Sequence, residues 1–203
     1  MRWLGSAPLV LASSSPFRAR LLAAAGLKAI VDAAAIDEGE IKAGFRREKR
    51  DTGACAAALA EAKAKRVSLR HPSALVIGAD QILDCGGEWL DKPRDIEEAR
   101  AQLQFLRGKR HELATAAAVI SDGAVLWHRV ERPSLAMREL SDGFIEDYLA
   151  AAGDGVCALV GAYAVEGLGA QLFDRIDGDY FAILGLPLLP LLGYLRERGA
   201  IAR

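Results

Sequence analysis

Hydroxyl side chains and one arginine gather directly after an apolar run near the start of the chain. Residues 9–12 are apolar, residues 13–15 are all serine, and Pro16 and Arg18 follow. Ser15 suits the N-cap of a helix because its oxygen can accept a bond from a free backbone N–H. Pro16 suits the first helical position. The free N–H groups would then lie beside the hydroxyls and Arg18, which is a setting for phosphate, although an ordinary capped helix would have the same sequence.

A carboxylate and a lysine farther along the chain could complete such a site. Asp80 follows the apolar run 74–79, so we expect it at the end of a strand, where open α/β folds bind ligands. A carboxylate there can bind a divalent metal or take a proton from water, or it can simply cap a turn. Lys92 precedes Pro93, whose fixed backbone would help to aim the ammonium at a phosphate; otherwise Lys92 is a solvated lysine.

Composition limits the classes of protein to which the chain can belong. Of its 203 residues, 52% are hydrophobic and 26% charged, which is typical of an ordered globular protein. A net charge of -1 argues against a broad nucleic-acid surface. Three distant cysteines and three histidines match neither a disulfide framework nor a zinc site. With no signal-peptide pattern and no apolar run that could span a bilayer, we expect a soluble, cytoplasmic protein.

Strand and helix patterns alternate along the chain before hairpins appear, which predicts a mixed α/β sheet. Strands are expected at 9–12, 28–35, 74–79, 111–120 and 125–137, with turns at 85–88 and 122–123. Helices are expected from Pro16 to Gly26, over 54–69 and 96–106, after Ser141, and at the end through Leu195. The polar stretch 39–53 is interpreted as a loop or mobile segment.

Taken together, the residues resemble a known family, the Maf (septum-formation-inhibitor-like) nucleotide pyrophosphatases. The shared motifs follow the family order over almost the whole chain: Ser13-x-Ser15-Pro16-x-Arg18, Asp37-Glu38, Lys63-Ala64, Gly78-Ala79-Asp80-Gln81, Lys92-Pro93, Gly108-x-x-His111-x-x-x-Thr115, Gly161-Ala162-Tyr163, Glu166-Gly167, Asp177-Gly178-Asp179-Tyr180 and Gly185-Leu186-Pro187. The resemblance implies one domain over residues 1–203. Its fold would be a mixed twisted sheet with flanking helices, two-lobed like inosine triphosphate pyrophosphatases, with a central cleft.

The resemblance also implies a reaction, which is cleavage of a nucleoside triphosphate between its α and β phosphates with the help of Mg²⁺ or Mn²⁺. The side chains implied to bind the substrate are Ser13, Ser15, Arg18, Lys63 and Lys92. Glu38 and Asp80 are the implied metal ligands, and Asp80 is also the candidate base that activates water. His111 matches a family position but could only satisfy hydrogen bonds in a strand.

Departures from the common family pattern concern the choice of base. Phe17, Gln81 and Glu166 stand where many members have Arg, Thr and Gln, and they resemble the branch that acts on 7-methyl-GTP. The positive charge of a 7-methylguanine favours an aromatic face and a nearby carboxylate. Residues 159–160 lack the usual Lys-Ala, which leaves a dTTP or UTP pyrophosphatase open.

Two further classes of protein are compatible with these residues. One is a nucleotide-sensing regulator of cell division without catalytic activity. The second is a nucleotidyl or sugar-phosphate transferase, although the chain contains neither a Walker sequence nor a dinucleotide fingerprint. A homodimer is a further expectation from the family resemblance.

Overall fold

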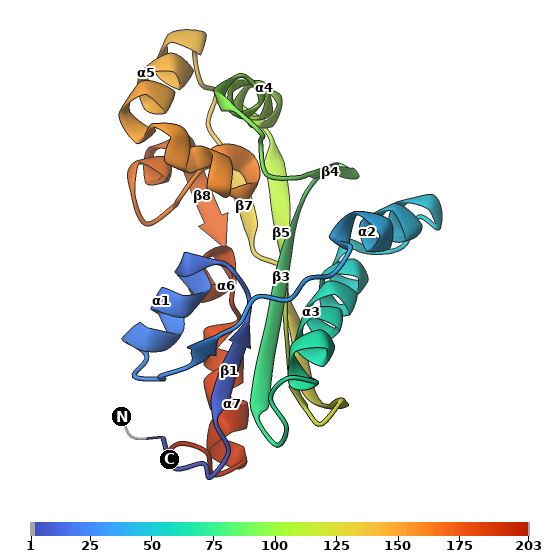
Figure 1. Ribbon diagram of the computed structural model, residues 1–203. Helices are drawn as coiled ribbons and strands as arrows, with labels where there is room; N and C mark the ends of the chain where they lie inside the picture. Colours follow the sequence, from blue (N-terminus) through green and yellow to red (C-terminus); the bar gives the residue numbers. More distant parts are fainter. Residues whose placement is uncertain (1–2, 203) are drawn as a thin grey trace. The chain divides into compact units, whose positions relative to one another are not determined.

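The computed structural model of the protein describes residues 3–202 (Figure 1). It is a mixed α/β fold whose strands follow the order β2-β1-β3-β5-β7-β8, with β4 paired to β3 and β6 paired to β5. The predicted fold class is therefore confirmed. Contacts divide the chain into two compact units. The first unit comprises residues up to 81, 115–131 and from 179 onward, and the second comprises 82–114 and 132–178.

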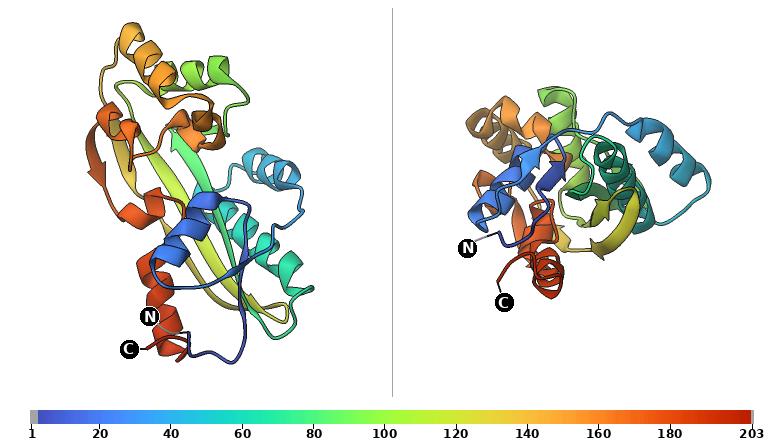
Figure 2. Two further views of the ribbon diagram at one scale, coloured as in Figure 1. Left: turned by 60° about the vertical axis from the view of Figure 1, so that its left-hand side comes forward. Right: turned by 60° about the horizontal axis from the view of Figure 1, so that its bottom comes forward.

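The first unit is a sheet with helices on both faces (Figures 1 and 2). Its elements are β1 (Leu9–Ala12), α1 (Pro16–Ala24), β2 (Ile30–Val31), α2 (Glu38–Arg47), α3 (Thr52–Ser68), the start of β3 (Leu75–Cys85), the end of β5 (Arg110–Ser121), β6 (Ala124–Glu131), α6 (Tyr180–Ile183) and α7 (Leu188–Glu197). Strand β1 pairs in parallel with β2 and β3. Because side chains alternate along a strand, Leu11 packs in a core with Leu191 of α7, whereas Val10 packs with Val67 of α3.

The second unit holds the remaining parts of β3 and β5 and a group of short elements. These are β4 (Glu88–Leu90), α4 (Ile96–Leu106), β7 (Ser134–Met137), α5 (Asp142–Ala152), three 3₁₀ helices (Asp154–Ala158, Val160–Ala162 and Leu168–Leu172) and β8 (Phe173–Asp177). Gly86 and Gly87 form the predicted hairpin turn, both with positive φ angles of 66° and 92°. Helix α4 packs against α5 within this unit.

Capping residues set the helix starts where the sequence predicts them. The Ser15 hydroxyl accepts a bond from the Arg18 backbone N–H at 3.5 Å, and Asp95 accepts one from Glu98 at 2.8 Å. Ser141 accepts one from the Phe144 N–H at 3.1 Å. These caps use backbone donors that a helix leaves without an internal partner, so they act within a single turn.

Three expectations about strands were wrong in length. Strand β3 continues through Asp80 to Cys85, because residues 83–85 pair with β4, so Asp80 lies inside a strand and not at its end. Strand β2 covers only Ile30–Val31 of the predicted 28–35. The predicted strand 125–137 is divided into β6 and β7 at Pro133, which has no N–H to offer to a ladder.

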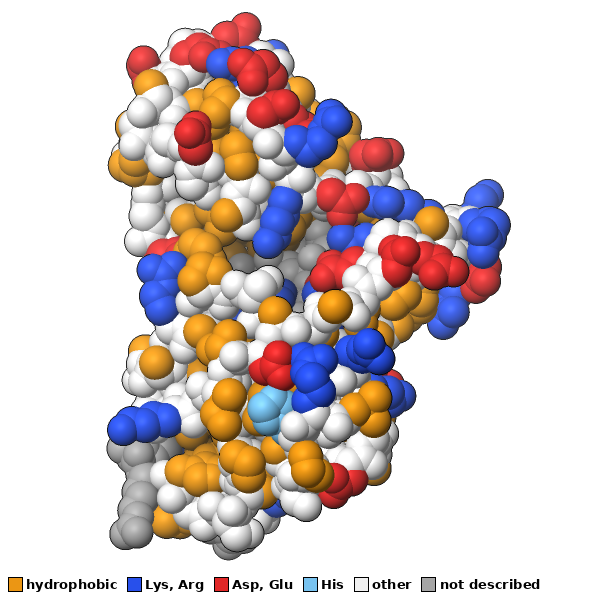
Figure 3. Space-filling model, in the orientation of Figure 1, with side chains coloured by type: hydrophobic (Ala, Val, Ile, Leu, Met, Phe, Trp, Pro, Cys, Tyr) orange, Lys and Arg blue, Asp and Glu red, His pale blue; other side chains and the backbone are white. Residues whose placement is uncertain are grey.

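The stretch 39–53, interpreted from its polarity as a loop, contains helix α2 and the start of α3. Asp37 caps α2 by accepting a bond from the Glu40 N–H at 2.9 Å. Acidic residues lie in its first turn and Arg46 and Arg47 in its last, which suits the helix dipole. No residue of α2 is buried, and Ile41 and Phe45 are its only large apolar side chains, so the sequence of this segment resembles that of a polar loop. Figure 3 shows Lys and Arg side chains gathered around the end of this helix.

Two exclusions can be checked within the described part of the chain. None of the helices in residues 3–202 is long and apolar enough to cross a membrane. Cys55, Cys85 and Cys157 are all free thiols, in agreement with the expectation from their number and their separation in the sequence.

Candidate active site

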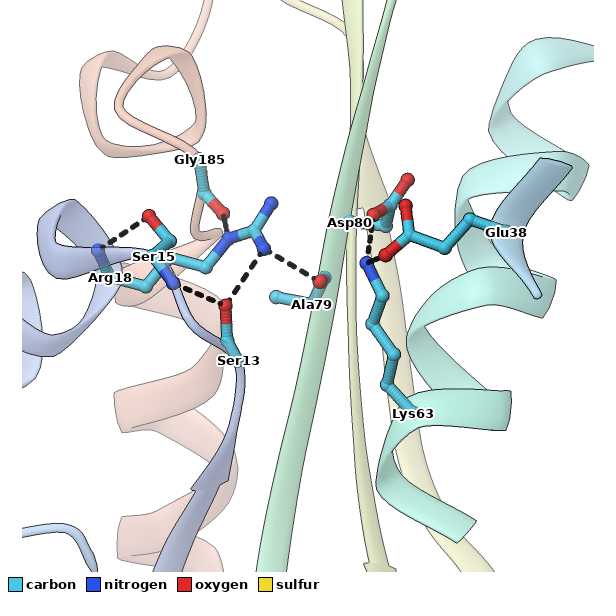
Figure 4. A network of polar contacts seen from close by, with 8 residues as sticks. All are labelled: Ser13, Ser15, Arg18, Glu38, Lys63, Ala79, Asp80 and Gly185. Atoms are coloured by element: carbon cyan, nitrogen blue, oxygen red, sulfur yellow. Dashed lines mark hydrogen bonds and ion pairs between the residues drawn. The ribbon is translucent and has the colours of Figure 1, made fainter. Parts of the chain in front are cut away.

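Arg18 is the centre of the first half of the site, which lies entirely in the first unit (Figure 4). Its Nε donates to the Gly185 carbonyl at 2.8 Å, and its Nη1 donates to the Ala79 carbonyl at 2.8 Å and to the Ser13 hydroxyl at 3.1 Å. The Ser13 oxygen also accepts a bond from the Ser15 N–H at 3.2 Å. These bonds use three of the five guanidinium N–H groups, so both donors on Nη2 can bind an anion.

Lys63 is the centre of the second half of the site. Its ammonium lies 2.5 Å from Asp80 Oδ1 and 2.8 Å from Glu38 Oε1. The Lys63 and Asp80 side chains are buried, whereas the Glu38 side chain is 44% exposed. In Figure 4 this group lies on one side of β3 and the Arg18 group on the other, where Arg18 reaches the strand at the Ala79 carbonyl.

Gly78 explains how a helical lysine reaches a carboxylate inside a strand. A Cβ at Gly78 would lie 2.0 Å from the Ala60 carbonyl oxygen and 2.9 Å from the Ala64 Cβ. The absence of a side chain therefore lets β3 approach the backbone of α3 closely. Lys63 is one turn beyond Ala60, so this contact brings its ammonium to Asp80.

Charges in the two halves act on one another. Burial lowers the pKa of Arg18, while the carboxylates of Asp80 and Glu38 oppose that effect. Burial also raises the pKa of Glu38, but the hydrogen bond and charge of Lys63, together with the charges of Lys42 and Arg18, outweigh it, so this pKa lies below its ordinary value. Glu38 is therefore held as a carboxylate by the group that it faces.

The same two carboxylates suit a hard divalent cation. Asp80 Oδ2 is buried and has no hydrogen-bond partner in the described structure, so one ligand oxygen is not satisfied by the protein. No group of three or more acidic, His or Cys side chains within residues 3–202 could hold an ion alone. Mg²⁺ is commonly bound through one or two carboxylates with substrate phosphates completing the shell. The donor set of Glu38 and Asp80 fits that arrangement.

Two of the predicted specificity residues also belong to the first unit. The Gln81 amide donates to the Thr115 hydroxyl and to carbonyls of α6, contacts that sequence reasoning did not find. Phe17 is half-buried, and the Arg20 guanidinium carbon lies 4.5 Å from the centre of its ring. Gly185 was missed as a site residue too, although the motif Gly185-Leu186-Pro187 pointed to its position. Its φ of 100° is one that favours glycine.

Three other residues of interest lie in the second unit. Lys92 and Glu166 are both exposed there, and their parts in binding stay predictions. His111 is buried in β5 with its Nε2 2.7 Å from the Tyr163 hydroxyl, which agrees with a hydrogen-bonding role for this residue. The His111 ring packs against Tyr163 and Phe173. Burial lowers the pKa of His111 to about 4, so the ring is neutral at pH 7.

We expect His111 to make the stability of the protein depend on pH. A histidine buried in its neutral form stabilises the fold above its unfolded pKa of about 6.5, and this contribution is lost as the pH falls toward about 4. The loss should reach about 3 kcal/mol of unfolding free energy. In His111→Gln, which can still bond Tyr163, denaturant unfolding between these pH values should show a smaller loss than in the parent. Equal losses in both proteins would contradict the prediction.

Comparison with known proteins places these residues in context. A family model described as Maf-like protein matches residues 8–198. A nucleoside triphosphate pyrophosphatase of Paramagnetospirillum magneticum is 52% identical over 192 residues, which is 95% of this chain and 99% of the relative. One of Rhodospirillum rubrum is 52% identical over 96% of both chains. A 7-methyl-GTP pyrophosphatase of Rhizobium johnstonii is 49% identical over 95% of this chain and 97% of the relative.

Proposed function

This chain belongs to the Maf-like protein family, and we propose that it hydrolyses nucleoside triphosphates between the α and β phosphates. The products are a nucleoside monophosphate and pyrophosphate. The observation that carries the proposal is that Asp80, with one buried and unpartnered carboxylate oxygen, is bound to Lys63 and acts through its charge on Arg18. The relatives named nucleoside triphosphate pyrophosphatase support this reaction.

The chain's own groups supply what hydrolysis at the α phosphorus requires. The reaction needs an oriented water, and it needs cations around the charged phosphate oxygens. Arg18 Nη2 and the Ser13 hydroxyl can donate hydrogen bonds to those oxygens. The other hydrogen bonds of these two side chains hold them in position. Asp80 Oδ1 is bound to Lys63, whereas Asp80 Oδ2 can take the proton of an attacking water.

A divalent metal ion, Mg²⁺ or Mn²⁺, belongs to the proposal. Glu38 and Asp80 would hold it, and when bound it neutralises charge on the phosphates. Because the Lys63 ammonium now lies between these two carboxylates, Lys63 serves as their counterion in the absence of the metal. The predicted cytoplasmic location and homodimeric state remain proposals as well.

Product analysis tests the reaction directly. The protein is incubated with single nucleoside triphosphates and Mg²⁺ or Mn²⁺, and the products are separated by ion-exchange chromatography. We expect equal amounts of monophosphate and pyrophosphate. Diphosphate and orthophosphate would mean that a different bond is cleaved, and binding without turnover would favour a nucleotide-sensing regulator.

For the base, we propose a preference for 7-methyl-GTP over GTP, dTTP and UTP. A relative named 7-methyl-GTP pyrophosphatase, at 49% identity, supports this choice. Relatives named nucleoside triphosphate pyrophosphatase are similar to this chain to about the same degree. The proposed preference for this base therefore rests mainly on Phe17, Gln81 and Glu166.

Replacing Glu166 by Gln tests the charge part of this preference. The carboxylate of Glu166 is expected to favour the positively charged base, whereas an amide of the same shape would not. One exposed charge pair contributes about 1 kcal/mol at contact distance, so the ratio of kcat/KM for 7-methyl-GTP over GTP should fall about fivefold. Glu112→Gln, another exposed residue of the second unit, serves as the matched control. An unchanged ratio in Glu166→Gln would show that Glu166 does not read the charge of the base.

A further inference from the structure

The connection between β2 and α2 is the segment 32–37, which contains neither helix nor strand and leads directly to Glu38, the first residue of α2 (Figure 1). From residue 32 to residue 38, the even-numbered residues are partly buried and the odd-numbered ones are exposed. This alternation is the period of an extended chain, so Asp32 and Glu38 face the protein from the same side of the segment. None of the backbone N–H groups of residues 33–36 donates to another backbone group within residues 3–202. The segment therefore depends on side-chain contacts to stay in place.

The first of these contacts surrounds the Asp32 carboxylate. Arg70 binds both of its oxygens, with Nη2 2.7 Å from Oδ1 and Nε 3.0 Å from Oδ2. Hydrogen bonds from Arg70 and His71 hold the pKa of Asp32 at about 2, so at pH 7 this carboxylate only accepts, and His71 Nε2 donates to its Oδ2 at 2.8 Å. Arg70 Nη2 also donates to the Ala33 carbonyl at 3.2 Å. These residues, Asp32, Arg70 and His71, form what we call the Asp32 clamp, which holds both a side chain and the backbone of the segment.

The other contacts of the segment are with the helix that ends just before the clamp. Helix α3 ends at Ser68, and Arg70 and His71 follow it directly. Ala34 packs against a buried cluster that includes Val67, and Glu38 binds Lys63, one turn farther back in α3. The segment thus runs along the end of α3 in the opposite direction, and all of these residues belong to the first unit. A shift of the segment by one residue would turn both carboxylates away from the protein.

We infer that the Asp32 clamp positions the Glu38 carboxylate for a divalent cation. Asp32, Arg70 and His71 are positioning residues, because they act on Glu38 through the segment that joins them to it. This inference rests on the proposed function, in which Glu38 and Asp80 hold the metal. When the clamp is opened, arrangements of the segment in which Glu38 faces solvent become populated. The apparent affinity for the cation then falls in proportion to the fraction of molecules in which Glu38 is in place.

Titration of the whole chain with Mn²⁺ alone tests the inference without requiring turnover. Electron paramagnetic resonance measures the free Mn²⁺ at each step. In Asp32→Ala, a fall of the positioned fraction to between about a third and a tenth would raise the Kd for Mn²⁺ about threefold to tenfold. Arg70→Ala opens the same clamp from its other side and should weaken binding to a similar extent. The double variant should bind no more weakly than either single variant.

Opposite changes in charge separate positioning from a simple electrostatic effect. Asp32→Ala removes a negative charge, which by itself disfavours a bound cation, whereas Arg70→Ala removes a positive charge, which by itself favours one. Weaker binding in both variants therefore indicates a shared effect on the position of Glu38. Glu61→Ala is the matched control, because it removes an exposed ion pair of α3, with Lys65 at 3.3 Å, that is not part of the clamp. Its Kd for Mn²⁺ should stay close to that of the parent.

A variant of Glu38 tests whether the clamp acts through this residue. Glu38→Gln lacks the positioned carboxylate and should bind Mn²⁺ more weakly than the parent, through Asp80. Adding Asp32→Ala to Glu38→Gln should weaken binding no further, since the clamp has no carboxylate left to position. A general loss of structure would instead lower the affinity in both backgrounds. Circular dichroism of each variant verifies that the compared proteins are folded.

Several results would overturn the inference and leave the proposed reaction standing. These are an unchanged Kd in both Asp32→Ala and Arg70→Ala, shifts of opposite sign in the two variants, and a further loss in the Glu38→Gln background. A parent that binds no Mn²⁺ would remove the metal from the proposed function, and this inference with it. A parent that binds Mn²⁺ with the expected pattern but releases no pyrophosphate from any nucleoside triphosphate would refute the reaction and leave the clamp's role standing.

Discussion

Asp80→Asn is expected to lower kcat for pyrophosphate release by about a hundredfold or more. The amide keeps the size of the side chain and can still accept the bond from Lys63, so the fold should be retained. It removes the negative charge and the basic oxygen Oδ2, which has no partner in the described structure. Initial rates with saturating metal and nucleotide measure the effect, and circular dichroism verifies that the variant is folded.

Asp84→Asn is the matched control, since Asp84 lies in the same strand four residues later. Its carboxylate accepts a bond from the Gly87 N–H in the hairpin turn and belongs to neither half of the site. We expect its kcat to stay close to that of the parent. A folded Asp80→Asn protein with turnover similar to Asp84→Asn would show that another group activates the water.

Lys63→Met is expected to lower the free energy of unfolding by about 3 kcal/mol when no divalent metal is present. Removal of the ammonium leaves the Asp80 and Glu38 carboxylates facing one another without a cation, and the Asp80 side chain is buried. Partial exposure of Glu38 places the expected loss at the lower end for a broken buried ion pair. Urea unfolding followed by circular dichroism measures it.

The control for this change is Lys65→Met, two residues away on the same helix. Lys65 is half-exposed and forms an ion pair with Glu61 at 3.3 Å, a contact that contributes only about 0.3–0.5 kcal/mol. Adding Mg²⁺ should raise the midpoint of thermal unfolding more in Lys63→Met than in Lys65→Met, because the metal can replace the lost cation. Equal losses of stability in the two variants, with no response to the metal, would contradict the proposed role of the carboxylates.

Several features of the site depend only on neighbouring residues, and these were predicted from the sequence. Ser15 caps α1, and Pro16 occupies its first position. The hairpin at Gly86 and Gly87 was predicted from its turn residues, and helix α3 from its many alanines, which favour a helix locally. Capping and turn formation involve groups a few residues apart, so they leave a signature in the sequence itself.

Helix α2 and the extent of β3 were not predictable in this way. Helix α2 is mostly polar and buries none of its residues. Its large apolar side chains, Ile41 and Phe45, lie four residues apart, but two such residues are too few to identify a helix. Strand β3 continues past Asp80 because β4 pairs with residues 83–85, and this pairing depends on the partner strand. The role proposed for Asp80 does not depend on a strand end, because the carboxylate is bound to Lys63.

The hydrogen-bond partners of the polar side chains at the site were decided by long-range packing. Arg18 donates to the carbonyl of Gly185, 167 residues away in the sequence, and Gln81 donates to that of Ala182, 101 residues away. No local pattern specifies such pairs, because backbone carbonyls are present at every residue and only the packed fold chooses among them. The sequence alone indicates which residue types can bind phosphate and metal. The tertiary structure decides which donors remain free to do so, because it satisfies the others internally.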